Sequence, residues 1–183
     1  MRSFIGIDFS SRLKREVADF QELLKEFAVS GRWKRADNFH LTLKFLDEIS
    51  DAQVQAIDAV LKRISWGTKE FCLNISHLGS FPGKGCLRVL WLSVSGDLQQ
   101  LSALQNHIET GLAPIGFEKE RRKFIPHITI AQDVIFDRDF EKIKKLAAVQ
   151  SFSEIKADHL SLFKSEQIRK NRVYTPLKEY KLG

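Results

Sequence analysis

Residues 39–46, FHLTLKFL, and residues 124–131, FIPHITIA, repeat one pattern almost half the chain apart. Each contains His-apolar-Thr-apolar within a run that alternates between polar and apolar side chains. Alternation with a period of two is typical of a β-strand with one buried face. Chance placement of five histidines and five threonines among 183 residues would give far fewer than one such pair, and the sequence has two. The repeat therefore predicts two structurally equivalent lobes.

The strand period also predicts which side chains lie together. His40, Thr42 and Lys44 are expected on one face of the first strand, and the apolar residues between and beside them on the other. His127 and Thr129 repeat that arrangement in the second strand. If the lobes face each other, two imidazoles and two hydroxyls converge across one cleft, with Lys44 as a further candidate binding residue.

The rest of the chain alternates between helix-like and strand-like periodicity and contains no low-complexity segment. Ser50 followed by Gln53 is typical of a capping box at a helix start. We expect an α+β fold with two pseudo-symmetric lobes around a central cleft, each an antiparallel sheet packed with helices, in a single domain of residues 1–183. Expected helices cover residues 11–29, 54–64, 98–112 and 138–149, and expected strands cover residues 4–9, 39–46, 70–78, 87–94, 124–131, 152–163 and 173–180.

The composition excludes several classes of protein. Hydrophobic residues make up 43% of the chain and charged residues 28%, so a disordered tail or a collagen-like fibre is excluded. Two cysteines are too few for a disulfide-rich scaffold. No apolar run approaches the roughly 20 residues that span a bilayer, and no signal peptide is evident, so we expect a cytoplasmic protein without a membrane partner. A net charge of +6 favours polyanionic partners, and the lack of a heptad pattern favours a monomer.

The paired residue types suit phosphoryl chemistry. Imidazole titrates near neutrality, so one of His40 and His127 can accept a proton while the other donates one. The hydroxyls of Thr42 and Thr129 can hydrogen-bond phosphate oxygens without adding charge. Such acid–base catalysis requires no metal and no cofactor. A lone strand histidine is more often structural, and a zinc site is the other chemical alternative, but two histidines without Cys, Asp or Glu at ligand spacing support zinc weakly.

Basic clusters precede both motifs. Residues 32–35 (RWKR) come before the first motif, and residues 121–123 (RRK) come before the second. One interpretation is a solvated loop in each case. The other is a rim that attracts nucleic-acid phosphates, with Arg121 and Arg122 as substrate contacts and Trp33 as a surface on which a base stacks.

Several segments besides the two motifs carry a resemblance to a known family. They are RSFIGIDF (2–9), Trp33 followed by NFHLTLKFLDEIS (38–50), LGSFPGKGCLRVLWLSV (78–94), FIPHITIAQ (124–132) and SLFKSEQIRKNRVYTPLKEYKL (161–182). The chain resembles the 2H phosphoesterase superfamily, which is named for two His-x-Thr/Ser-x motifs. The resemblance is closest to the bacterial and archaeal RNA 2′,3′-cyclic phosphodiesterases, once called 2′-5′ RNA ligases, and it implies two pseudo-symmetric α+β lobes with one motif in each.

The resemblance implies metal-independent hydrolysis of a terminal 2′,3′-cyclic phosphate on RNA or on a small nucleotide. His40 would be the proton donor and His127 the proton acceptor, while Thr42 and Thr129 hold the phosphate. His127 would activate water, His40 would protonate the departing 3′-oxygen, and a 2′-phosphomonoester would remain. With a 5′-hydroxyl in place of water, the same site would reversibly form a 2′-5′ linkage.

The second motif departs from the family pattern in its flanks. Many relatives have Arg two residues before the second His and another Arg shortly after the motif, where this chain has Ile125 and Gln132. A cation from residues 121–123 would compensate for this loss of charge. Two other functions therefore stay open: an RNA-binding module with weak or no hydrolysis, and a phosphoesterase for a non-RNA substrate such as an ADP-ribose cyclic phosphate.

Overall fold

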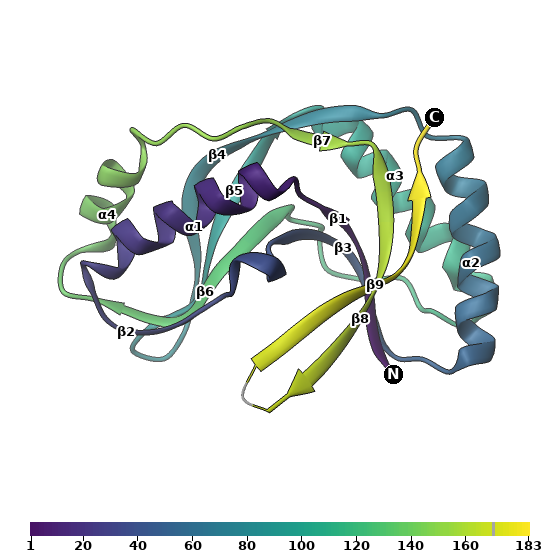
Figure 1. Cartoon of the computed structure of the whole chain (residues 1–183), viewed down its shortest axis with the longest axis horizontal. Coiled ribbons are helices and arrows are strands. Elements are labelled where there is room, and N and C mark those ends of the chain that lie inside the picture. Colours follow the sequence, from purple (N-terminus) through teal and green to yellow (C-terminus); the bar gives the residue numbers. More distant parts are fainter. Residues whose placement is uncertain (170) are drawn as a thin grey trace.

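The computed structural model of the chain describes residues 1–169 and 171–183 and contains two antiparallel sheets with helices packed against them (Figure 1). The four-stranded sheet has the order β3-β1-β8-β9, with β1 (Arg2–Asp8), β3 (His40–Glu48), β8 (His159–Ile168) and β9 (Asn171–Lys181). The five-stranded sheet has the order β2-β6-β5-β4-β7, with β2 (Ala28–Trp33), β4 (Phe71–Pro82), β5 (Leu87–Gly96), β6 (His127–Phe136) and β7 (Ile155–Ala157). The helices are α1 (Ser11–Lys25), α2 (Asp51–Trp66), α3 (Leu98–Leu112), α4 (Phe140–Ala147) and the short 3₁₀ helices η1 (Ala36–Asn38) and η2 (Ala113–Ile115). This architecture confirms the expected α+β class of two lobes.

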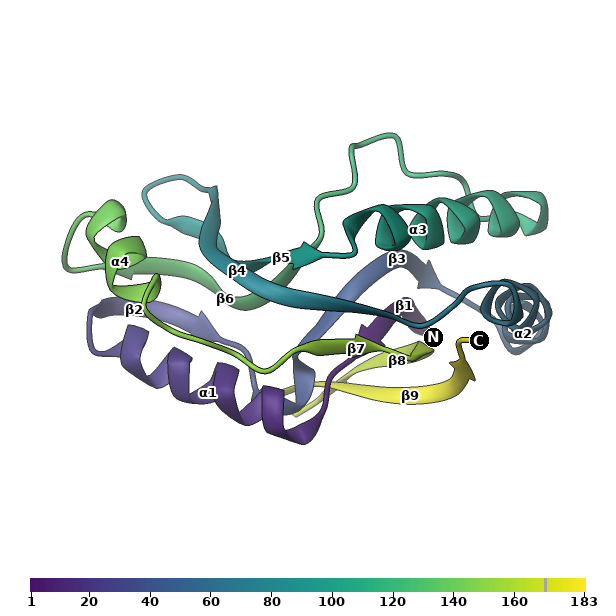
Figure 2. The same ribbon diagram turned by 90° about the horizontal axis from the view of Figure 1, so that it is seen from above.

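Each lobe contains elements from both halves of the chain. α1 follows β1 of the four-stranded sheet but contacts β2 of the five-stranded sheet, where α4 contacts β4. α3 follows β5 of the five-stranded sheet but packs on β3 and α2, beside the four-stranded sheet (Figures 1 and 2). The two motif strands, β3 and β6, belong to different sheets and contact each other where the lobes meet.

α1 ends earlier than the sequence pattern predicts. The Ser10 side chain accepts a hydrogen bond from the backbone N–H of Leu13 and caps the helix start. The helix stops at Lys25, and the residues expected to continue it to position 29 lead into β2, which pairs with β6. Residues 29–31 (VSG) have poor helix propensity, and pairing with β6 satisfies their backbone groups instead. β2, which the pattern does not predict, lies directly beside the strand that carries the second motif.

Other expected elements are present with shifted boundaries. The expected strand at 152–163 is two strands, because β7 pairs with β4 in one sheet and β8 pairs with β1 in the other. The capping box at α2 is confirmed, because Ser50 Oγ accepts from the N–H of Gln53 at 3.3 Å and Gln53 Oε1 accepts from the N–H of Ser50 at 2.9 Å. β6 begins at His127, three residues later than expected. No helix within residues 1–169 and 171–183 has the length and apolar character needed to cross a membrane.

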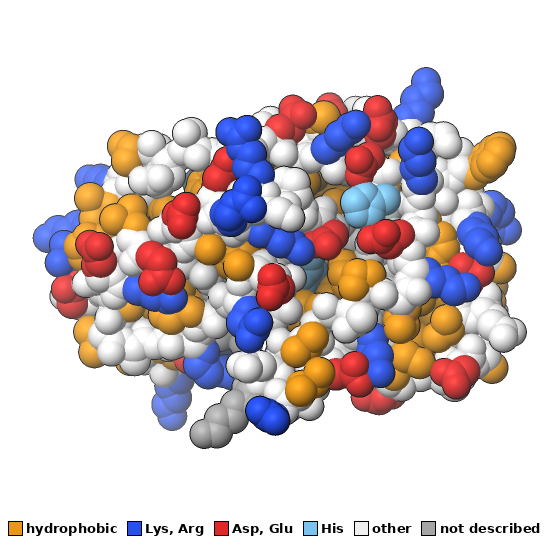
Figure 3. Space-filling view, in the orientation of Figure 1, with side chains coloured by type: hydrophobic (Ala, Val, Ile, Leu, Met, Phe, Trp, Pro, Cys, Tyr) orange, Lys and Arg blue, Asp and Glu red, His pale blue; other side chains and the backbone are white. Residues whose placement is uncertain are grey.

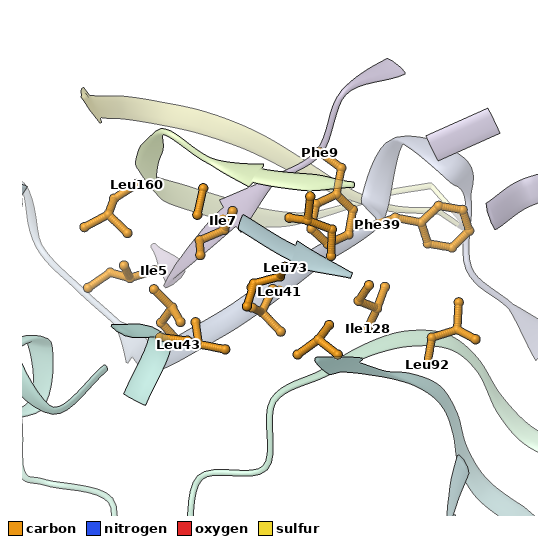
Figure 4. Packing of buried hydrophobic residues seen from close by; sticks show 14 of the residues in the cluster. Ile5, Ile7, Phe9, Phe39, Leu41, Leu43, Leu73, Leu92, Ile128 and Leu160 are labelled. Atoms are coloured by element: carbon orange, nitrogen blue, oxygen red, sulfur yellow. The ribbon is translucent and has the colours of Figure 1, made fainter. Parts of the chain in front are cut away.

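One continuous hydrophobic core joins the two sheets (Figure 4). Leu41 and Leu43 of β3 lie in this core, as do Ile128 and Ile130 of β6, and none of the four is more than 3% exposed. The apolar residues of both motifs therefore anchor their strands in the same core, as the alternating pattern predicts. This turns the histidine and threonine side chains to the opposite face of each strand.

Candidate active site

His40, the first residue of β3, is held by hydrogen bonds at both ring nitrogens. Nδ1 lies 2.8 Å from the carbonyl oxygen of Asn38, and Nε2 lies 2.9 Å from Thr42 Oγ1. Because a carbonyl oxygen only accepts, Nδ1 carries a hydrogen. In the neutral ring Nε2 is then an acceptor, and the Thr42 hydroxyl donates to it. The spacing of the motif thus brings the hydroxyl to the ring nitrogen that is free to exchange a proton.

Aromatic side chains surround the His40 ring. The centroid of the ring lies 4.5 Å from that of Phe4 and 5.1 Å from that of Tyr174, which meets it edge-on. Burial lowers the pKa of His40 to about 4, against the opposing effects of the Asn38 carbonyl and the Asp8 carboxylate. His40 is therefore neutral at pH 7 in the ligand-free protein.

His127 begins β6 in the same way as the first motif histidine begins β3. Its Nδ1 lies 2.6 Å from the carbonyl oxygen of Ile125, two residues earlier, so Nδ1 again carries a hydrogen and Nε2 is left for proton transfer. The ring stands edge-on to Phe81 with 5.3 Å between centroids, and lies 6.1 Å from Trp91. Trp91 fits there because its cross-strand partner is Gly79, where an added Cβ would lie 2.2 Å from the indole.

The two motif histidines therefore share one tautomer and one orienting contact. In each case the partner of Nδ1 is the backbone carbonyl two residues before the histidine. In each case a threonine follows two residues later on the same strand face. The strands that carry them are in contact, so the arrangement offers two imidazole Nε2 atoms and two hydroxyls near the junction of the lobes.

Lys44 does not lie on the face that the strand period predicts. A β-bulge interrupts the pairing of β1 with β3, and beyond it Lys44 is buried while Phe45 is exposed. The Lys44 ammonium donates to Glu109 Oε2 at 2.6 Å and to the carbonyl oxygen of Glu118 at 2.8 Å, and the side chain is 5% exposed. The expected face of the Lys44 side chain is therefore wrong, because its ammonium ties β3 to α3 and to the segment before the second motif. Its contact with substrate stays a prediction.

Arg121 and Arg122 lie in the segment between η2 and β6, which forms neither helix nor strand. Both are exposed, and Arg122 pairs with Glu120 at 2.8 Å. Their contact with substrate stays a prediction.

Trp33 ends β2 and packs partly buried against the core. The ammonium of Lys25 lies 5.7 Å from the centroid of its ring, so one ring face already has a cation over it. The aromatic rings closest to the motif histidines come from β1, β9, β4 and β5 instead. The role of Trp33 as a stacking surface stays a prediction. The strand period could not predict the aromatic rings beside the motif histidines, because it does not indicate which strands pair.

The two positions where relatives carry Arg have other contacts here. Ile125 is 48% exposed and contributes its backbone carbonyl to the second motif histidine. Gln132 pairs across the sheet with Arg32, whose guanidinium is bonded to Asp133. The guanidinium of Arg32, which lies across the sheet from Gln132, is therefore already neutralised by a carboxylate.

Among the residues that the structure describes, no group of three or more His, Cys, Asp or Glu side chains could hold a metal ion. Two pockets of about 340 Å³ and 320 Å³ lie between α2 and β9 and beside the turn that joins β4 to β5. The described residues that line these pockets do not include a motif histidine. The side chains suited to phosphoryl chemistry are therefore the histidine and threonine of each motif, on the two strands that meet between the lobes.

Comparisons with known proteins agree on one family. The family described as LigT like Phosphoesterase matches residues 7–91 and again residues 92–174. The chain is 31% identical to a protein of Aquifex aeolicus named RNA 2′,3′-cyclic phosphodiesterase, over 100% of this chain and 98% of that protein. A protein of Methanocaldococcus jannaschii with the same name is 29% identical over 98% of this chain and 100% of its own length. The crystal structure of E. coli LigT complexed with 3′-AMP matches with a TM-score of 0.80 and 27% identity, covering 99% of this chain and 97% of that one.

Proposed function

The chain belongs to the LigT-like phosphoesterase family, and we propose that it is an RNA 2′,3′-cyclic phosphodiesterase that opens a terminal 2′,3′-cyclic phosphate to a 2′-phosphomonoester. The observation that carries the proposal is the duplicated site. Two strands in contact each begin with a histidine whose Nδ1 is bonded to the carbonyl two residues before it, followed by a threonine on the same face. Relatives that match the chain over its full length carry the name of this activity.

The two Nε2 atoms suit the two proton transfers of this hydrolysis. His127 Nε2 accepts a proton from water as the water oxygen bonds to phosphorus. The bond from phosphorus to the 3′-oxygen breaks, and His40 Nε2–H gives its proton to that oxygen. With a 5′-hydroxyl in place of water, His127 accepts the proton of that hydroxyl, His40 protonates the departing 3′-oxygen, and a 2′-5′ linkage forms. Cleavage of this linkage back to the cyclic phosphate is the reverse reaction, in which the two histidines exchange roles.

His40 becomes a proton donor only after it has gained a second ring proton. Its pKa of about 4 leaves the ring neutral at pH 7 in the ligand-free protein. A phosphate anion beside Nε2 stabilises the imidazolium and raises this pKa. Binding of a phosphate ester is therefore accompanied by proton uptake at His40, and the affinity for the ester increases as the pH falls below neutrality.

The Thr42 hydroxyl changes its hydrogen bond in the same step. In the ligand-free protein it donates to His40 Nε2. Once Nε2 is protonated, the hydroxyl can only accept from it, and its own hydrogen is available for a nonbridging phosphate oxygen. Thr129 supplies the second hydroxyl from the other lobe.

We further propose that residues 1–183 act as one bilobal unit. Leu41 and Ile128, from the two motifs, belong to the same buried cluster. A shift of one motif strand would therefore disturb the packing of the other.

The direct test is turnover of an oligoribonucleotide that ends in a 2′,3′-cyclic phosphate, measured in EDTA. We expect the wild-type protein to release a 2′-phosphomonoester. His40→Ala and His127→Ala should each lower kcat by about 10²–10⁴-fold, the range of a general acid or base. His107→Ala is the matched control, because His107 is an exposed histidine of α3 and its loss should leave kcat unchanged.

Other outcomes separate the other functions. Wild-type turnover no faster than that of the two motif variants would contradict the proposal. RNA affinity without turnover would indicate a binding module, and turnover of a cyclic mononucleotide or a cyclic phosphate of ADP-ribose but not of RNA would indicate a non-RNA substrate. Turnover that EDTA abolishes would indicate a metal-dependent reaction.

A further inference from the structure

Lys34, which directly follows β2, is fixed at the junction of the lobes. Its backbone N–H donates to the carbonyl oxygen of Ile130 in β6 at 2.9 Å. Its own carbonyl oxygen accepts from Gln21 Nε2 at 3.0 Å, and the same amide nitrogen donates to the Ile130 carbonyl at 2.6 Å. Gln21 is 3% exposed, so these bonds are shielded from water and hold Lys34 beside the residue that follows Thr129.

The Lys34 side chain extends toward the first motif. The preceding side chain, Trp33, lies under Lys25 of α1, and successive side chains of an extended chain point to opposite sides. The charge of Lys34 is one of the influences that lower the pKa of His40, so the ammonium lies near that ring. The backbone of Lys34 is therefore bonded to Ile130 of β6, the residue after Thr129, and its charge acts on His40 of β3.

Lys34 differs from Lys14 and Arg35, two cations near the first motif, because each of these has a carboxylate partner. Lys14 pairs with Asp8 at 2.6 Å, and Arg35 pairs with Asp37 at 3.3 Å. Within residues 1–169 and 171–183, burial and two positive charges are the influences on the pKa of Lys34, and no carboxylate is among them. The side chain is nevertheless only partly exposed, unlike a lysine that is fully hydrated at the surface.

The surroundings of Lys34 favour a bound anion. Burial, together with the positive charges of Arg32 and Arg172, lowers the pKa of Lys34. Asp133 offsets the charge of Arg32, but a partly buried ammonium that also feels the Arg172 guanidinium is unfavourable until an anion lies beside it. Figure 3 shows Lys and Arg side chains interspersed with Asp and Glu over one face of the molecule.

We propose that Lys34 binds the cyclic phosphate of the substrate, with its ammonium bonded to a nonbridging oxygen between His40 and Thr129. This inference rests on the proposed function and adds a cation to it. A fixed ammonium at this place also stabilises the negative charge that develops on the phosphoryl oxygens as water attacks. Since the phosphate neutralises Lys34, its binding also weakens the repulsion that opposes protonation of His40.

The test compares Lys34→Gln and Lys34→Arg with Arg35→Ala. Arg35 is the matched control, because it is the adjacent cation, is exposed and pairs with Asp37. Titration calorimetry with inorganic phosphate measures binding without requiring turnover. We expect Lys34→Gln to lose about 10- to 100-fold in phosphate affinity, the range of one hydrogen bond to a charged group. Lys34→Arg should retain most of the affinity, and Arg35→Ala should match the wild type.

Two substrates then locate the contact. Lys34→Gln should lower kcat/KM by the same factor for a nucleoside 2′,3′-cyclic monophosphate and for an oligoribonucleotide with a 2′,3′-cyclic end. Loss on the oligoribonucleotide alone would place Lys34 on an upstream phosphate and overturn the proposal. Unchanged phosphate affinity in Lys34→Gln would also overturn it. If the wild-type protein hydrolyses neither substrate, the proposed function fails, and the calorimetry still decides whether Lys34 binds phosphate.

A second readout does not depend on any ligand. In the Lys34→Gln variant the pKa of His40, followed by NMR titration of the ring protons, should rise because a nearby positive charge has been removed. Arg35→Ala should leave this titration as in the wild type. An unchanged His40 titration in Lys34→Gln would show that the ammonium lies too far from the motif and would contradict the proposal.

Discussion

His40 and His127 have the same sequence context and the same Nδ1 hydrogen bond, but their surroundings differ. His40 is packed among aromatic rings, accepts from Thr42 and has a pKa that burial lowers to about 4. His127 stands edge-on to Phe81. The repeated motif thus determines which ring nitrogen is available for proton transfer. The pKa of His40 depends instead on side chains from strands that are distant in the sequence.

The strands beside the two motifs show the same divergence. The residue of β1 paired with Thr42 is Gly6, where an added Cβ would lie 2.7 Å from a backbone carbonyl oxygen of β3. The residue of β5 paired with Thr129 is Trp91. One hydroxyl therefore lies beside bare backbone and the other beside an indole, so two copies of one motif can hold different parts of a substrate.

The largest expected effect separates the two proton-transfer roles. Thymidine 3′-(4-nitrophenyl phosphate) has a leaving group that needs no proton. On this compound we expect His40→Ala to recover most of its lost turnover, whereas His127→Ala keeps a loss of about 10²–10⁴-fold, because water still needs a base. The absorbance of nitrophenolate measures the rate. The opposite pattern would exchange the two assignments.

The next effect concerns the position four residues after each histidine, which is Lys44 in one motif and Ala131 in the other, both buried. Lys44→Met leaves Glu109 buried without its cation, and we expect a loss of about 3–5 kcal/mol in the free energy of unfolding in urea. The double variant Lys44→Met/Glu109→Leu removes both charges and should recover much of that loss. A single variant as stable as the wild type would contradict this account of the pair.

The burial of His40 also predicts a pH dependence of stability. The pKa of His40 is about 4 in the folded protein against 6.5 for an unperturbed histidine, so the unfolded chain binds more protons between these values. The free energy of unfolding should therefore fall as the pH decreases from 6.5 to 4, by at most about 3 kcal/mol from this residue. Chemical denaturation of His40→Gln across this range should show a smaller fall than the wild type, and His127→Gln should retain the His40 contribution. An equal fall in wild type and His40→Gln would contradict the lowered pKa.

The smallest effect compares the two hydroxyls. Thr42→Val and Thr129→Val should each reduce affinity for inorganic phosphate by roughly 2- to 10-fold, the range of one neutral hydrogen bond. Only Thr42→Val should also raise the pKa of His40, because the hydroxyl that donates to its neutral ring is gone. NMR titration of the two variants checks this. A shift of the His40 titration in Thr129→Val alone would contradict the hydrogen-bond assignment.

Local periodicity predicted what depends on neighbours along the chain. The strand period placed Leu41 and Ile128 in the core, and the spacing of Ser50 and Gln53 placed the capping box at the start of α2; both predictions are confirmed. It failed at Lys44 because the β-bulge arises from pairing with β1, which no local pattern encodes. It also missed β2, since that strand depends on pairing with β6.

The candidate site shows the same limit. The spacing His-x-Thr predicted a hydroxyl beside each imidazole, and for Thr42 a hydrogen bond to the ring is present. The rings of Phe4 and Tyr174 beside His40 come from β1 and β9, and the bonds that hold Lys34 come from α1 and β6. These contacts follow from sheet order, so sequence spacing alone could not reveal them.

The exchange of helices between the lobes constrains how such a molecule can arise. α1 leaves the sheet of β1 to cover the other sheet, and α3 makes the reciprocal move, so neither half of the sequence encloses a core alone. A shorter ancestor with a single motif would have needed a second copy of itself, swapped helix for helix, before it could fold. Fusion of two such copies into one polypeptide would let the residues around each histidine change independently, which is impossible in a pair of identical subunits.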